Sequence, residues 1–211
     1  MHLAGQVDAD RYLEGWPMRI RAEVTDLCAS PNGARDRQLL IGAQVVVFED
    51  IAGWAFVQAA DGYVGYVQAV DLSDPLDPTH FVATIATHAY AQEDFKSVNT
   101  HSLPFGARVT VIHERRKFFE TNVGFVPKSH LREINRPFND PATVAQLQFG
   151  VPSLWGGTSS RGMDCSGLST AGVAGCDIAW AGVCVLVGES WGAALGGRYA
   201  GRDVGWWVGD V

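Results

Sequence analysis

The sequence predicts a chain built mostly of β structure, with two small barrels followed by an incomplete α+β domain. Short apolar runs rich in β-branched and aromatic residues, separated by turn residues, fill the first part of the chain. The pattern of one set of runs returns in a second set, as expected for a repeated unit. Helix-start signals and a glycine-rich loop ahead of a cysteine appear only after residue 139.

Composition and charge narrow the class of protein. The 211 residues are 47% hydrophobic and 18% charged, which is a globular rather than a disordered profile. The net charge is −7 and no basic run is present, so we expect no nucleic acid partner. No apolar run reaches the roughly 18 residues of a transmembrane segment. Residues 1–21 lack the apolar stretch of a secretory signal, so we expect a short leader there and a cytoplasmic protein, with export by another route as the alternative.

The cysteines indicate a reducing compartment. There are four, Cys28, Cys165, Cys176 and Cys184, with no Cys-x-x-Cys pair among them. That number is too low for a disulfide scaffold. No cysteine lies near a histidine at the spacing of a zinc site, so we expect no zinc site.

Residues 22–73 are expected to form the first barrel. Val45–Phe48, Trp54–Val57 and Tyr63–Val67 read as strands, and Asp61-Gly62 between the last two predicts a hairpin turn. We expect Phe48, Trp54 and Val67 in the barrel core, since aromatic side chains bury a large area. Tyr63 or Tyr66 could instead face a peptide-binding groove.

Residues 81–133 repeat this pattern after a linker at residues 74–80, where two prolines interrupt regular structure. The sequence from Gln38 to Val47 lines up with that from Ser102 to Val111, and the stretch 62–67 parallels 122–127. Both copies resemble the bacterial SH3-like fold, with its leucine-x-x-glycine entry and glycine-tyrosine-valine-glycine exit. The resemblance implies two SH3-like barrels.

A second linker at residues 134–139 leads into the domain expected over residues 140–211. Asp140 is suited to an N-cap and Pro141 to the first position of a helix. Val144 and Leu147 share one face, and Gly150 is suited to end the helix. Downstream, Asp164 is a second candidate N-cap, which places Cys165 in the first turn of another helix. The positive end of the helix dipole favours a thiolate there. A buried structural cysteine is the alternative.

The segment from Trp155 to Leu168 resembles the nucleophile segment of the NlpC-type cell-wall peptidases, which are papain-like cysteine endopeptidases. The resemblance implies that Cys165 is the catalytic nucleophile and that no cofactor is needed. It places Asp164, Ser166 and Trp155 beside the substrate, a peptidoglycan-derived peptide. In that family a tyrosine commonly follows the proline of the preceding loop, whereas this chain has Ser153.

The expected catalytic base is missing after the nucleophile. The family places a histidine downstream of the cysteine, but the last histidine here is His130. Residues 169–211 are rich in glycine and tryptophan and show no family-like pattern. We therefore expect a partial domain with an atypical tail, either truncated or frame-shifted after Leu168. A fold-back of His113 or His130 onto Cys165 is an alternative.

Two functions follow from these expectations. The first is what the resemblance implies, a cysteine endopeptidase that cleaves cell-wall stem peptides at a γ-D-glutamyl-diamino-acid bond through a Cys165 thioacyl intermediate. The second is a catalytically inactive protein that binds cell-wall peptides. A thiol probe separates them, because an activated cysteine labels faster than an ordinary one.

Overall fold

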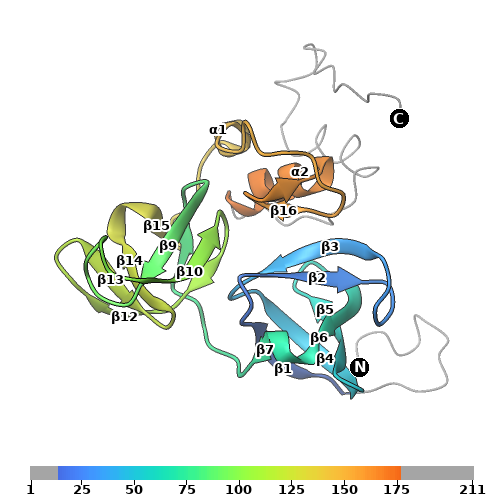
Figure 1. The fold of residues 1–211 in the computed structure, drawn as a ribbon. Helices are drawn as coiled ribbons and strands as arrows, with labels where there is room; N and C mark the ends of the chain where they lie inside the picture. The colour runs from blue at the N-terminus through green and yellow to red at the C-terminus, as the bar shows by residue number, and fades with distance from the viewer. Residues whose placement is uncertain (1–13, 177–211) are drawn as a thin grey trace, which may run out of the picture.

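The computed structural model describes residues 14–176, which are mostly β structure with two α-helices near the C-terminal end. Figure 1 shows two β units side by side, with the helices across one end of the pair. Most of the atypical tail falls at residues 177–211, so the predictions about it lie outside the described residues.

The N-terminal β unit (residues 16–73) is one sheet of seven strands in the order β3-β2-β6-β5-β4-β1-β7. Its strands are β1 (Trp16–Ile20), β2 (Val24–Cys28), β3 (Arg35–Leu40), β4 (Gln44–Ile51), β5 (Trp54–Ala59), β6 (Val64–Gln68) and β7 (Leu72–Ser73), with a 3-10 turn at Ala69–Asp71. The alternating apolar residues of these strands close on one core. The predicted hairpin at Asp61-Gly62 is confirmed, since β5 pairs with β6 and Gly62 has a φ of 91°.

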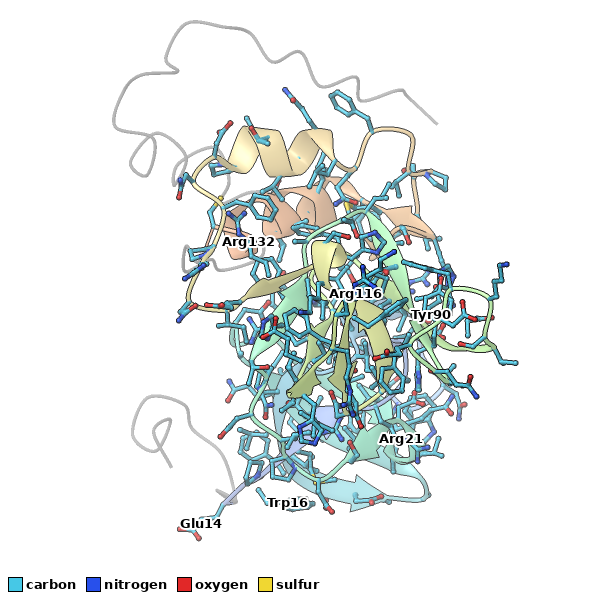
Figure 2. All side chains as sticks on the ribbon, turned by 90° about the vertical axis from the view of Figure 1, so that its left-hand side faces the viewer. Glu14, Trp16, Arg21, Tyr90, Arg116 and Arg132 are labelled. Atoms are coloured by element: carbon cyan, nitrogen blue, oxygen red, sulfur yellow. The ribbon has the colours of Figure 1, made fainter. Side chains whose placement is uncertain are left out.

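The leader expected over residues 1–21 extends too far into the chain. Trp16–Ile20 forms β1, which pairs with β4 on one side and β7 on the other. Ile20 is fully buried in the core, and this burial favours a strand over a loosely packed leader. Trp16 lies at the end of the molecule opposite the helices (Figure 2).

The central β unit (residues 80–133) contains a five-stranded sheet, β10-β9-β14-β13-β12, and a three-stranded sheet, β11-β8-β15. Its strands are β8 (His80–Val82), β9 (Ala86–Tyr90), β10 (Asn99–Pro104), β11 (Arg108–Val109), β12 (Val111–Glu114), β13 (Phe118–Thr121), β14 (Gly124–Pro127) and β15 (Leu131–Glu133), with a 3-10 turn at Lys128–His130. Gly42 and Gly106, aligned by the sequence repeat, both have a φ of 81°.

The two β units are joined by more than their linker. Ile41 of the N-terminal unit is buried in the core cluster of the central unit, beside Val82 and Leu103. The backbone N–H of Arg108 donates to the carbonyl of Ile41 at 2.9 Å. An apolar side chain shared in this way fixes one unit against the other.

The C-terminal segment (residues 140–176) carries α1 (Pro141–Gln146), a short hairpin of β16 (Thr158–Ser159) and β17 (Gly162–Met163), and α2 (Cys165–Ala174). The predicted helix start is confirmed, since the Asp140 carboxylate accepts from the backbone N–H groups of Ala142 and Thr143. Phe138 anchors this segment to the central unit. Its ring lies beside those of Phe81 and Phe105, and the guanidinium of Arg132 sits 4.3 Å above it. Figure 2 shows Arg132 reaching toward the helices.

Candidate active site at the start of α2

Cys165 is the first residue of α2 and its side chain is exposed. The predicted N-cap is present, because the Asp164 Oδ1 accepts from the backbone N–H of Gly167 at 2.7 Å and from the Ser166 hydroxyl at 2.7 Å. The first N–H groups of any helix have no acceptor within the helix, and a cap supplies an acceptor for only some of them. The positive end of the helix dipole also lies at the first residue. The Cys165 thiol therefore lies beside the first N–H groups of α2.

The glycine-rich loop holds the cap in place. The second carboxylate oxygen of Asp164 accepts from the N–H of Gly156 at 2.8 Å, and the Asp164 N–H donates to the carbonyl of Gly157 at 3.2 Å. Gly156 has a φ of 68°, and a Cβ there would lie 2.8 Å from the carbonyl oxygen of Asp36. A side chain at position 156 would thus strain the backbone and push the loop away from the N-terminal β unit.

Strand β3 of the N-terminal β unit lies against this loop (Figure 1). The Thr158 hydroxyl donates to the backbone carbonyl of Gln38 at 3.2 Å, and the Arg35 Nε donates to the carbonyl of Trp155 at 3.0 Å. Arg35 and Gln38 thus connect the first barrel to the nucleophile loop. Sequence reasoning missed both, because a single long-range hydrogen bond leaves no periodic pattern in the sequence.

Glu23 joins all three parts of the molecule. One carboxylate oxygen accepts from the backbone N–H of Ser102 at 2.6 Å, and the other forms an ion pair with Arg161. Glu23 belongs to the N-terminal β unit, Ser102 to β10 and Arg161 to the β16–β17 hairpin. One carboxylate therefore sets the hairpin before Cys165 relative to both β units.

The other predicted site residues lie around this helix start. Ser166 follows Cys165 and its hydroxyl is used in the cap. The Trp155 side chain is 78% exposed, so its indole stands in solvent beside the loop. Ser153, where the resembled family has a tyrosine, is exposed, and its backbone forms a bridge with Met163.

The two histidines weighed as substitutes for the missing base have positions of their own in the central β unit. His130 Nδ1 lies 2.7 Å from the Thr87 hydroxyl. His113 is exposed on β12, which Figure 1 shows on the side of that unit away from α2. Neither observation supports a fold-back of these side chains onto Cys165.

The other cysteines of the described segment suit a structural role. Burial raises the pKa of the Cys28 thiol, and the negative charges of Asp26 and Asp36 raise it further. Burial also raises the pKa of Cys176, with a smaller contribution from Asp140. Both therefore stay protonated at neutral pH and are poor nucleophiles.

Metal-binding clusters and membrane-spanning helices are both absent from the part of the chain that the structure describes. Within residues 14–176 no cluster of three or more His, Cys, Asp or Glu side chains could hold a metal ion. None of the helices described is long and apolar enough to cross a membrane.

Comparisons with known proteins agree with this architecture. Residues 27–72 match the family model of the bacterial dipeptidyl-peptidase SH3 domain. An NlpC/P60 family protein from Bacillus cereus ATCC 10987 superposes with a TM-score of 0.65 at 16% identity, over 76% of this chain and 72% of that one. At this identity the likeness establishes the fold.

Two further solved structures are less similar. NlpC2 from Trichomonas vaginalis has a TM-score of 0.34 at 14% identity, over 81% of this chain and 69% of that one. NlpC1 from the same organism has a TM-score of 0.34 at 15% identity, over 82% of this chain and 67% of that one. No curated protein matched the sequence. Residues 27–72 thus match a bacterial SH3 domain, and the fold of the chain is similar to that of an NlpC/P60 family protein.

Proposed function

We propose that the protein is a cysteine endopeptidase of the NlpC type that hydrolyses cell-wall stem peptides, at the bond between γ-D-glutamate and a diamino acid. The observation that carries the proposal is the exposed Cys165 thiol at the Asp164-capped start of α2, held against a bacterial SH3 domain. We interpret the central β unit as a second SH3-like barrel, on the basis of the sequence repeat and the shared conformation of Gly42 and Gly106.

The reaction uses the sulfur and the backbone at the start of the helix. The Cys165 thiolate attacks the carbonyl carbon of the γ-glutamyl bond, and the carbonyl oxygen becomes an oxyanion. The backbone N–H of Cys165, at the first position of α2, stabilises that charge. Collapse of the intermediate breaks the C–N bond, and the leaving amine takes up a proton from solvent water. Water then hydrolyses the thioacyl group and regenerates the thiol.

Substrate contacts are assigned to the rim of this site. Asp164 and Ser166 supply a carboxylate and a hydroxyl beside the nucleophile, and they suit the free amino end of a stem peptide. The exposed Trp155 indole offers an apolar surface next to them.

The second candidate is a protein that binds cell-wall peptides without cleaving them. One observation favours it: no histidine follows Cys165, so the usual proton acceptor for the thiol is missing from the downstream sequence. The two candidates share the ligand and differ in the chemistry at Cys165.

Product analysis separates the candidates. The full chain and its C165S variant are incubated with the tripeptide L-Ala-γ-D-Glu-meso-diaminopimelate, and the products are identified by mass spectrometry. The peptidase proposal requires release of free diaminopimelate by the wild type and none by C165S. Equal binding by both proteins with no release would establish the binding function instead.

A further inference from the structure

The N-terminal β unit has an open cleft that the proposed reaction does not use. Strands β2 and β6 pair only at Cys28 and Tyr66, so the rest of β2 diverges from its neighbour. The gap holds a cleft of about 420 Å³, walled by Thr25, Asp26, Trp54, Gln68 and Asp71 among others. That volume falls within the range of small-ligand sites.

Trp54 connects this cleft to a second hollow. A second hollow of about 300 Å³ is lined by Pro31, Ile51 and Tyr66, among others, and it shares Trp54 and Asn32 with the first. The prediction that Trp54 lies in the barrel core is wrong, since its side chain is only half-buried and lines both hollows. We call the two adjoining hollows together the groove. Its polar half contains Asp26 and Asp71, and its apolar half contains Pro31, Ile51 and Tyr66, with Glu49 also in the lining.

The polar half of the groove carries negative charge. Asp26 and Asp71 both line it, and no lysine or arginine is among its lining residues. Asp26 is partly neutralised, because its Oδ1 accepts from Arg35 Nη1 at 3.3 Å and from Gln38 Nε2 at 3.0 Å. Asp71 has a neutral partner, the Thr25 hydroxyl, which donates to Oδ2 at 2.5 Å. Asp71 is thus the stronger counter-charge for a ligand.

The rim of the apolar half has an unusual backbone. Ala52 has a φ of 52° and Asn32 a φ of 57°, and both residues line that hollow. A left-handed conformation is common for asparagine and costly for alanine. Strained residues of this kind often cluster at ligand sites.

We propose that this groove binds a peptide through a primary ammonium group, which pairs with the Asp71 carboxylate beside the Trp54 indole. An ammonium ion is attracted both to a carboxylate and to the face of an indole. The adjoining apolar hollow receives the aliphatic part of the side chain. No residue of the C-terminal segment lines the groove, and binding there needs no hydrolysis, so the outcome of its test is distinguishable from that of the peptidase proposal.

The test uses the full chain and two short peptides in a nuclear magnetic resonance titration. Acetyl-Gly-Lys-Gly-amide carries the ammonium group, and the same peptide with an acetylated lysine lacks it. We expect the first to shift the Trp54 indole N–H and the backbone signals of Thr25 and Asp71. We expect the second to bind about tenfold more weakly, the value of one good charge contact.

Matched variants assign the effect to the groove. D71N keeps an acceptor for the Thr25 hydroxyl and removes the charge, whereas D77N makes the same change in the exposed linker outside the groove. We expect D71N to weaken binding about tenfold and D77N to leave it unchanged. W54A is a second variant, and we expect it to weaken binding of the lysine peptide as well. If W54A does not fold, the comparison of D71N with D77N decides the proposal. Equal binding of the two peptides, or equal effects of D71N and D77N, would overturn the proposal.

Discussion

At the scale of single residues, Asp164 is the side chain on which the nucleophile most depends. Its carboxylate accepts from the N–H groups of Gly156 and Gly167 and from the Ser166 hydroxyl. We expect D164A to lower the free energy of unfolding by about 1–2 kcal/mol, the usual value of an N-cap. We also expect it to slow alkylation of Cys165. Urea denaturation and timed iodoacetamide labelling measure the two effects.

The matched control for D164A is D140A, which removes the corresponding cap from α1. It should reduce stability while leaving Cys165 labelling unchanged. A similar loss of labelling in both variants would mean that the cap acts only through the general stability of the segment.

His80 makes the stability of the central β unit depend on pH. Burial lowers the pKa of this histidine, and the nearby Glu133 only partly opposes the shift. The unfolded chain therefore takes up a proton at higher pH than the folded chain does. The contribution of neutral His80 to the free energy of unfolding is fully present above about pH 6.5, the usual histidine pKa. It is lost as the pH falls through the lower pKa that His80 has in the folded chain.

We expect the urea midpoint of the wild type to fall between pH 7.5 and 5.5, and the fall to be smaller in H80Q. The exposed His113 supplies the control, and H113Q should keep the wild-type pH dependence. An identical pH profile for wild type and H80Q would refute the assignment.

At the scale of elements, the turn after α1 contains a buried polar group that the structure leaves unsatisfied. Both amide atoms of Gln148 are buried without a hydrogen-bond partner among the described residues. A buried amide of this kind costs about 1–3 kcal/mol. We therefore expect Q148L to raise the free energy of unfolding by about that amount. Q146L, at an exposed position of α1, should change little, and no gain from Q148L would show that the amide finds a partner in solution.

Elements with local signals were predictable from the sequence. Asp140-Pro141, Asp164 before Cys165 and the Asp61-Gly62 turn each encode their structure within a few residues, and all three formed as expected. Strand β1 was missed because Trp16–Ile20 is defined by its pairing with β4 and β7 rather than by alternation of its own. Ile41 was read as part of the first repeat, and only the tertiary packing shows it in the core of the second.

At the scale of the whole molecule, Glu23 couples the three parts. The ion pair with Arg161 is largely exposed and should contribute little, about 0–1 kcal/mol. The bond from the Ser102 N–H is stronger, since a backbone donor left without an acceptor costs about 1–3 kcal/mol. We expect E23A to destabilise the chain more than R161A does, and to raise hydrogen exchange at both Ser102 and the β16–β17 hairpin.

The exposed pair of Glu114 and Lys128 gives a control confined to the central β unit. E114A should leave hydrogen exchange at the hairpin unchanged. If E23A and E114A gave the same exchange pattern, Glu23 would not connect the parts. None of these contacts could be read from the sequence, because Glu23, Ser102 and Arg161 lie far apart along the chain and carry no shared pattern.

The most direct test of the account is the chemistry of Cys165 itself. The full chain is mixed with excess L-Ala-γ-D-Glu-meso-diaminopimelate and quenched in acid within seconds, and its peptides are mapped by mass spectrometry. The account predicts an L-Ala-γ-D-Glu acyl group on Cys165, removed by hydroxylamine and absent from Cys28 and Cys176. An unmodified Cys165 under conditions where the tripeptide is bound, or cleavage that persists in C165S, would contradict it.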